Sequence, residues 1–175
     1  MARRLRPVGL DFIEVAPTRL VFSGRTTAAP EDVYRALAEE VEGWPRWFRA
    51  VTLARPTHGG AGREVKLAGG VRFQETIMAA DPERRYAYRV DETNAPGIQA
   101  LLEEWRLTPS GSGTHVQWTF AADGPTPVRF ALTAARPGLG HSFRSAVRAL
   151  DLRLAARRRT ADQGNQTDPV DPVDQ

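Results

Sequence analysis

The sequence predicts an α+β protein in which a curved antiparallel sheet of about seven strands wraps around a long C-terminal helix. Three features lead to this prediction. Residues 51–123 alternate between apolar and polar side chains and are interrupted by short turn sequences, which is typical of antiparallel hairpins. A helix start follows the first predicted strand, and residues 138–159 carry apolar side chains at helical spacing.

The chain has the length of one domain. It has 175 residues, of which 41% are hydrophobic and 26% charged, as is usual for a soluble globular domain. It contains no cysteine, which excludes a disulfide framework, a thiolate nucleophile and a cysteine zinc site. We assign residues 16–159 to the domain, residues 1–15 to an N-terminal arm and residues 160–175 to a disordered acidic tail.

The tail and the body differ in charge. Residues 160–175 hold four of the 21 acidic residues and no Lys or Arg, so residues 1–159 carry 24 basic against 17 acidic side chains. The tail lacks an apolar period and cannot bury enough surface to offset the entropy lost on ordering. A basic body is compatible with anionic partners, although dispersed arginines also serve solubility alone.

The first strand is expected at Thr18–Thr27, and a helix follows it. Pro30 suits the first helical turn, and the two acidic residues after it favour the positive end of the helix dipole. Apolar residues at i, i+4 and i+8 form one face of this helix, namely Val33, Leu37 and Val41. We expect Gly43 to end it and Trp44–Phe48 to form a short second helix that closes one end of the core.

Six more strands are expected, at Ala50–Arg55, Arg63–Ala68, Val71–Ala80, Arg84–Glu92, Ile98–Thr108 and Thr114–Ala122. Alternation places one set of side chains on an apolar face, namely Phe73, Glu75, Ile77, Tyr86, Tyr88, Val90, Leu101, Glu103, Trp105, Leu107, Val116, Trp118 and Phe120. The opposite face carries polar residues such as Arg72, Arg85 and Arg89 and is expected to face water.

A long amphipathic helix is expected at about Gly138–Arg159, with a shorter helix before it at residues 126–136. Its apolar stripe consists of Leu139, Phe143, Val147, Leu150 and Leu154. This stripe suits the apolar face of the sheet. His141, Arg144 and Arg148 are expected on the outer side of the helix, and Pro137-Gly138 to separate it from the shorter one.

A set of local motifs is similar to those of a known superfamily, namely Ala29–Tyr34, Trp44–Phe48, Phe73–Glu75, Asp81–Tyr88, Trp105–Pro109 and Gly113–Val116. In this order, the motifs and the predicted elements resemble the START-like (SRPBCC) helix-grip superfamily, and more narrowly its bacterial polyketide cyclase/dehydrase-like branch. The resemblance covers about residues 16–158. It implies a deep cavity between sheet and helix that holds a hydrophobic or amphipathic small molecule. The resemblance specifies the activity less narrowly than the fold, because the superfamily includes carriers, cyclases, hydrolases and chaperone activators.

Two carboxyl groups fall on the predicted apolar face. Glu75 and Glu103 are surrounded there by apolar neighbours, and a buried carboxylate is costly unless it is paired or protonated. Each is a candidate anchor for a ligand hydroxyl or amine, or a general acid or base with a raised pKa. The alternatives are an internal ion pair, with Arg63 or Arg136 as partner, and an exposed position near a strand end.

The predicted ligand-binding residues are Phe73, Glu75, Ile77, Tyr86, Tyr88, Glu103, Trp105, Trp118, Leu139, Phe143 and Val147. The tyrosine hydroxyls can donate to a ligand oxygen, and the tryptophans can stack on a flat ligand. Each of these aromatic residues also suits an ordinary core position.

No nucleophile motif or phosphate-binding loop is present, and no catalytic residue is assigned. The three histidines fall in a turn, on the polar strand face and on the outer helix face, so we expect no metal site, and no cofactor is predicted. The arginines of the outer sheet face lack the exposed aromatic residues that single-stranded nucleic acid requires, which argues against nucleic-acid binding.

Three functions remain open. The first is binding of a hydrophobic small molecule such as a lipid or polyketide. The second, implied by the resemblance, is an aromatase/cyclase in which Glu75, Tyr88 or Glu103 moves protons. The third is a protein-interaction module like the chaperone activators, using Arg144 and Arg148. Because no transmembrane run or signal peptide is found, we expect a cytoplasmic protein, either monomer or homodimer.

Overall fold

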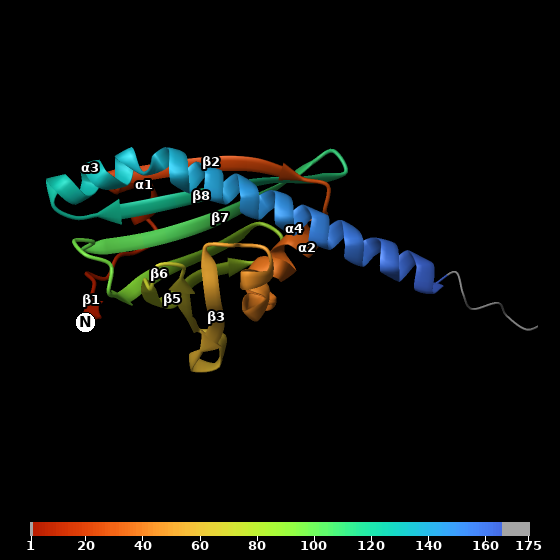
Figure 1. Cartoon of the computed structure of the whole chain (residues 1–175), viewed down its shortest axis with the longest axis horizontal. Helices are drawn as coiled ribbons and strands as arrows, with labels where there is room; N and C mark the ends of the chain where they lie inside the picture. Colours follow the sequence, from red (N-terminus) through yellow and green to blue (C-terminus); the bar gives the residue numbers. More distant parts are fainter. Residues whose placement is uncertain (1, 166–175) are drawn as a thin grey trace, which may run out of the picture.

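The computed structural model describes residues 2–165 and has the predicted α+β architecture (Figure 1). Seven strands form one antiparallel sheet in the order β2-β8-β7-β6-β5-β4-β3. Their bounds are β2 Thr18–Thr26, β3 Val51–Thr57, β4 Gly62–Leu67, β5 Arg72–Asp81, β6 Arg85–Thr93, β7 Ala100–Ser110 and β8 Gly113–Asp123. Each bound lies within two residues of its prediction, because period-two alternation and turn residues are local signals.

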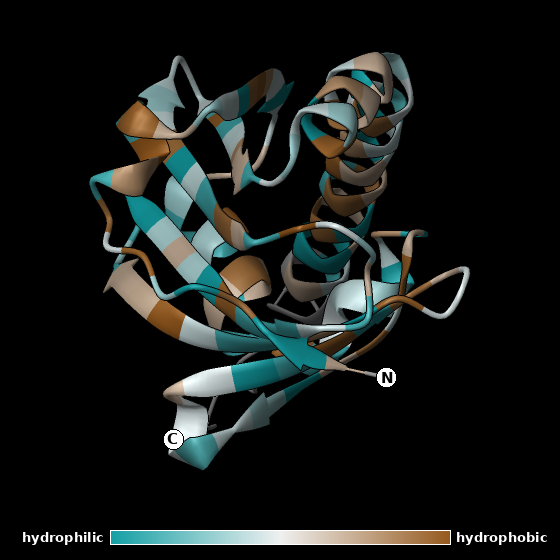
Figure 2. Ribbon diagram, turned by 90° about the vertical axis from the view of Figure 1, so that its left-hand side faces the viewer, coloured by the Kyte–Doolittle hydropathy of each residue, from teal (hydrophilic) through white to brown (hydrophobic). Residues whose placement is uncertain are grey.

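The helices are α1 Phe12–Val15, α2 Pro30–Tyr34, the π turn η1 Arg35–Glu39, the 3-10 turns η2 Val41–Arg46 and η3 His58–Gly60, α3 Thr126–Ala134 and α4 Arg136–Asn165. In Figure 1, α4 runs along the sheet and continues past its edge. Figure 2 views α4 nearly along its axis, with the sheet curving past its side and below it. The helix-grip prediction is thus confirmed.

The boundaries of α4 differ from those predicted. The break after α3 falls at Ala135, and Pro137 is the second residue of α4, where a missing N–H costs no helical hydrogen bond. The helix continues to Asn165, six residues past the predicted end at Arg159, so residues 160–165 are helical rather than part of a disordered tail. The rest of the predicted tail, residues 166–175, lies outside the described residues.

The first helical segment contains a π turn that the sequence did not indicate. The N–H of Glu40 donates to the carbonyl oxygen of Arg35, five residues earlier, at 2.8 Å. The segment ends at Glu39 rather than Gly43, and a 3-10 turn replaces the predicted second helix at Trp44–Phe48. The predicted apolar face is nevertheless buried, with Val33 and Leu37 both at 0% exposure.

Gly24 lets α4 pack closely on the edge strand β2. A Cβ atom at Gly24 would lie 3.3 Å from Val147 and 3.4 Å from Phe143, tighter than most Cβ contacts. Both side chains are therefore pressed against the sheet and fully enclosed in the core. At the same end of the sheet, α4 leaves the core and runs beyond β2 (Figure 1).

The predicted polar face of the sheet is only partly exposed. The N-terminal arm crosses it, and the apolar side chains of Val8, Phe12 and Ile13 pack on Leu102 and neighbouring alanines. The short strand β1 (Arg3–Arg4) pairs antiparallel with the end of β6. The expectation of one uniformly wet face was therefore wrong, because the arm, whose apolar residues are too few to form a core of their own, buries them on the sheet.

Candidate functional site

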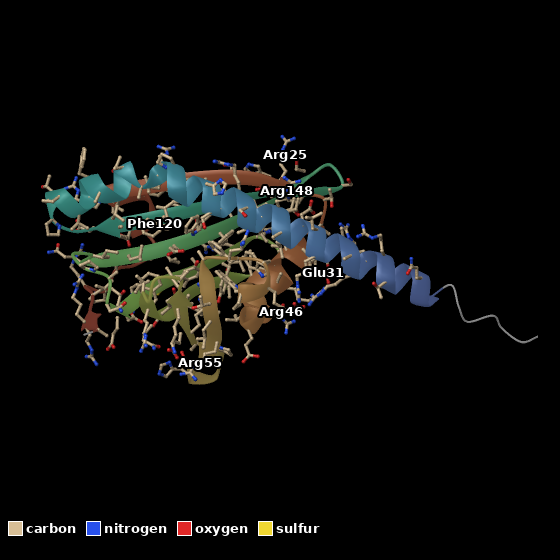
Figure 3. All side chains as sticks on the ribbon, in the orientation of Figure 1. Arg25, Glu31, Arg46, Arg55, Phe120 and Arg148 are labelled. Carbon is tan, nitrogen blue, oxygen red and sulfur yellow. The ribbon has the colours of Figure 1, made fainter. Side chains whose placement is uncertain are left out.

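A cavity of about 110 Å³ lies between the inner face of the sheet and α4. Its lining consists of Trp44, Phe48, Ala50, Val51, Arg63, Val65, Leu67, Phe73, Glu75, Tyr88, Glu103, Trp118, Phe120, Leu139 and Ser142. Ala50, Leu67, Leu139 and Ser142 are half-buried and form its rim, whereas the remaining lining residues are buried. Phe120, labelled in Figure 3, lies beneath the start of α4.

The predicted ligand-binding residues divide into three groups. Those that line the cavity are Phe73, Glu75, Tyr88, Glu103, Trp118 and Leu139. Trp105, Phe143 and Val147 do not line it, because other aromatic rings or β2 cover them. Trp105, for example, stacks on Trp118 with ring centroids 5.7 Å apart and meets Trp44 edge-on at 6.0 Å.

The two other predicted residues, Ile77 and Tyr86, line a separate open groove of about 690 Å³. Three glutamates, Arg46 and Arg157 surround this groove, and Arg157 is bound to Glu40 by hydrogen bonds of 2.8 Å. Arg46, labelled in Figure 3, lies on η2 and lines the groove. The groove is larger than the cavity, but it is open to solvent, and the ion pair of Arg157 with Glu40 at its wall is partly exposed. The cavity, with its buried polar groups, is therefore the stronger candidate site.

Glu103 is held by a buried hydrogen-bond network. Its Oε2 atom accepts a hydrogen bond from the Tyr88 hydroxyl at 2.8 Å and another from Trp118 Nε1 at 2.9 Å. The Tyr88 hydroxyl in turn accepts one from Trp105 Nε1 at 3.0 Å. Within the described chain, no hydrogen bond involves the other carboxyl oxygen of Glu103, Oε1. That oxygen is therefore available to a ligand or to a proton.

Burial raises the pKa of the Glu103 carboxyl to about 7, and the nearby Glu75 carboxyl adds to the rise. The hydrogen bond from Tyr88, the positive charge of Arg63 and the hydrogen bond from Trp118 oppose it. Near neutral pH, Glu103 is thus divided between a neutral acid, which can donate a proton, and a carboxylate, which can accept one.

Glu75 forms the buried ion pair that was one of its predicted alternatives. Arg63 Nε donates a hydrogen bond to Glu75 Oε2, and both side chains are only 2% exposed. Burial raises the pKa of the Glu75 carboxyl, and the Arg63 guanidinium opposes this rise. Two aromatic rings also contact the guanidinium, whose Cζ atom lies 4.1 Å from the ring centroid of Trp44 and 3.8 Å from that of Tyr88.

Arg63 has one unsatisfied donor group. Its Nη1 atom is buried and has no hydrogen-bond partner among the described residues. Buried polar groups are nearly always hydrogen-bonded, because each unmade bond leaves the desolvation cost uncompensated. The sequence indicated Arg63 only as a possible partner for Glu75 and not as a cavity residue. Alternation on its strand could have placed it on the inner face with Val65.

The histidines lie apart, as predicted. His58 lies in η3, His115 on β8 and His141 on α4. Over residues 2–165, no three His, Asp or Glu side chains are close enough together to hold a metal ion. None of the helices in this part of the chain combines the length and the apolar content that a bilayer crossing requires.

The curved sheet, the C-terminal helix and the cavity between them define a START-like (SRPBCC) helix-grip protein. Comparison with family models specifies this class further. The model described as polyketide cyclase / dehydrase and lipid transport matches residues 19–155, and the chain belongs to this family.

Relatives with similar sequences occur in mycobacteria. Uncharacterised proteins of Mycobacterium tuberculosis and Mycobacterium bovis are each 33% identical to the chain over 158 residues, covering 85% of this chain and 94% of theirs. Their names give no activity.

Solved structures share the fold. A START superfamily protein from Mycobacterium smegmatis superposes with a TM-score of 0.64 at 12% identity, covering 79% of this chain and 97% of that one. A protein from Rhodobacter sphaeroides superposes with a TM-score of 0.63 at 23% identity, covering 89% and 99%. At these identities the likeness concerns the fold alone.

Proposed function

We propose that this protein binds a hydrophobic or amphipathic small molecule in the cavity between its sheet and α4. The observation that carries the proposal is an aromatic-lined cavity with buried polar groups, Arg63, Glu75 and Glu103, at one place in its wall. Ligand sites typically combine a mainly apolar lining with a few polar groups that orient the ligand. The family description, which includes lipid transport, supports the same proposal.

The cavity volume limits what it can enclose. At about 110 Å³ it is smaller than the engineered apolar cavity of about 150 Å³ that binds benzene. The enclosed part of the ligand therefore corresponds to one small ring or a short chain. A longer ligand would extend past the rim between Ala50 and Ser142. We thus propose that the polar wall and the rim contact different parts of an amphipathic ligand.

We propose acid/base catalysis, as in a cyclase or dehydrase, as a second function. The burial of Glu103 favours it, because a carboxyl group with a pKa of about 7 suits proton transfer at neutral pH. The hydrogen bond from the Tyr88 hydroxyl holds that carboxyl group in place. Under this proposal, Glu103 takes a proton from the ligand carbon or returns one to a leaving hydroxyl. Loss of turnover in Glu103→Gln, with ligand binding retained, is the expected result.

Native mass spectrometry tests the binding proposal. The purified full chain is compared with the same sample after denaturation and organic extraction, and an extra mass that extracts as an apolar compound is expected. Ala50→Trp, at the cavity rim, is expected to lose that mass. Ala131→Trp, on the exposed surface of α3, is the matched control and is expected to keep it. A clean apo mass, with no thermal shift from fatty acids, sterols or small aromatic ketones, contradicts the proposal.

We propose further that the protein is cytoplasmic and acts as a monomer or homodimer, without nucleic acid. In support of the last point, arginines on the outer sheet face pair with acidic neighbours, such as Arg89 with Asp91 at 2.7 Å and Arg85 with Asp81 at 2.8 Å. Their charge is thus largely compensated. Size-exclusion chromatography with light scattering measures the oligomeric state.

A further inference from the structure

We propose that the enclosed part of the ligand is an uncharged single ring bearing a carbonyl oxygen, which accepts a hydrogen bond from Arg63 Nη1. This inference rests on the proposed binding function and specifies the ligand class. It is argued from three features of the cavity wall: the unpaired donor, the charges beside it, and the shape and volume of the enclosed space.

The unpaired donor calls for an acceptor. Arg63 is 1% exposed, its Nε is used by Glu75, and its Nη1 has no hydrogen-bond partner among the described residues. The rings of Trp44 and Tyr88 lie against its guanidinium and stabilise the positive charge, but a ring face is a weaker acceptor for an N–H than an oxygen atom. An oxygen placed there satisfies a group that is otherwise desolvated without compensation. A hydrogen bond to this donor therefore contributes more to the binding free energy than one to an already paired donor would.

The charges of the wall favour a neutral ligand. The Arg63 guanidinium already has one carboxylate partner in Glu75, and the carboxyl of Glu103 lines the same cavity. A ligand carboxylate would add a further negative charge beside Glu75 in a site removed from water, which is unfavourable. A ligand ammonium would be repelled by the positive charge of Arg63. A carbonyl oxygen accepts the hydrogen bond without bringing a net charge into the cavity.

The volume and the lining favour a ring. Trp44, Phe48, Trp118 and Phe120 present ring surfaces to about 110 Å³ of space, which is less than a benzene-binding cavity offers. A single ring comes near to filling this space and can pack against the aromatic side chains, whereas a steroid nucleus exceeds the volume. The carbonyl then lies at the polar end, toward Arg63, and any further substituent points to the rim at Ser142.

Three probes of matched ring size test the proposal. Cyclohexanone and methylenecyclohexane differ only in C=O against C=CH₂, and cyclohexanecarboxylate carries the charge. We measure their dissociation constants at pH 6 and pH 8 by titrating the ¹⁵N-labelled full chain and following the indole N–H signals of Trp44 and Trp118. Cyclohexanone is expected to bind at least about ten-fold more tightly than methylenecyclohexane at both pH values, because it accepts a hydrogen bond from a charged donor. Cyclohexanecarboxylate is expected to bind most weakly of the three.

A double variant tests the role of Arg63. Arg63→Met combined with Glu75→Met removes the pair without leaving a buried charge, and it is expected to abolish the preference for the ketone while retaining methylenecyclohexane binding. If this variant does not fold, a second measurement takes the place of this test, namely the NMR spectrum of cyclohexanone labelled with ¹³C at the carbonyl. Its bound signal in the wild-type protein is then expected downfield of its position in an apolar solvent, as a hydrogen-bonded carbonyl requires.

The outcomes separate this inference from the proposed function. Equal affinity for cyclohexanone and methylenecyclohexane, or tighter binding of the carboxylate, overturns the carbonyl assignment and leaves a general apolar site. A ketone preference that persists in the double variant also overturns it. Absence of binding by all three probes, together with a clean apo mass, overturns the proposed function itself.

Discussion

The hydroxyl of Tyr88 donates a hydrogen bond of 2.8 Å to Oε2 of Glu103, and the two residues are direct cross-strand partners on β6 and β7. The second polar contact of the cavity has the same origin, since Arg63 and Glu75 are direct partners on β4 and β5. Two strand registers therefore assemble the polar wall of the site. Three of the predictions below concern these pairs, and the fourth concerns the N-terminal arm on the opposite face of the sheet.

Glu103→Gln is expected to change how stability depends on pH. The pKa of Glu103 is raised from its ordinary value of 4.5 to about 7, so the folded state holds a proton that the unfolded state releases. The contribution of Glu103 to the stability of the folded wild-type protein therefore falls by about 3 kcal/mol as the pH rises from 4.5 to 7. Urea unfolding across this range is expected to show Glu103→Gln gaining stability relative to wild type as pH rises.

A control with the opposite sign is available. The hydrogen bond from Arg157 lowers the pKa of Glu40, so its stabilising contribution is present at neutral pH and is lost as the pH falls through that lowered value. Glu40→Gln is thus expected to lose stability relative to wild type as pH rises. A Glu103→Gln difference that does not vary with pH would contradict the assignment.

Tyr88→Phe is expected to destabilise the protein by about 1–3 kcal/mol, because the indole N–H of Trp105 and Oε2 of Glu103 both lose a partner. Removal of a donor to the carboxylate also raises the pKa of Glu103 further. Carboxyl ¹³C titration measures that pKa. Tyr34→Phe, whose hydroxyl makes no hydrogen bond within the described residues, is the matched control, and an equal effect of the two substitutions would argue against the network.

Arg63→Met is expected to destabilise the protein by about 3–5 kcal/mol, because Glu75 is left buried without its partner. Replacing both residues by Met is expected to cost much less than the sum of the two single substitutions, since apolar pairs often replace buried ion pairs at little cost. A double-mutant cycle by urea unfolding measures the coupling. Additive effects would mean that the two side chains do not act as a pair.

Phe12→Ala is expected to cost about 3 kcal/mol, because Phe12 is 6% exposed and attaches the N-terminal arm to the sheet. Phe130→Ala is the matched control on α3. That side chain is 75% exposed, so its loss is expected to change stability by less than about 0.5 kcal/mol. Thermal unfolding measures both. A small effect at Phe12 would show that the arm contributes little to the domain.

The sequence predicted well which face of the sheet each side chain occupies. It predicted less well which side chains contact each other. Alternation placed Glu75, Tyr88 and Glu103 on the inner face, and all three line the cavity. Arg63 entered only as one of two arginines that could pair with Glu75. Trp105 was expected to line the cavity but is covered by other rings, because the aromatic cluster closes over it.

The N-terminal arm is a second case in which the sequence did not predict a contact between distant segments. Val8, Phe12 and Ile13 are apolar but too few and too irregular to predict an element that crosses the sheet. Their burial depends on Leu102, some 90 residues later in the chain. The sequence around Leu102 does not indicate which segment packs on it. A pattern over a short window carries no information on contacts at such separation.

The sequence by itself determined the order of the main strands and helices, the strand bounds within two residues and the inner face of the sheet. These follow from periodicities of 2.0 and 3.6 residues and from turn residues, which act over short distances along the chain. Only the tertiary structure decided that Arg63 meets Glu75, that Tyr88 meets Glu103, and that about 110 Å³ stays open beside them. Those features depend on strand register, sheet curvature and the close approach of α4 at Gly24, which arise when distant segments pack together.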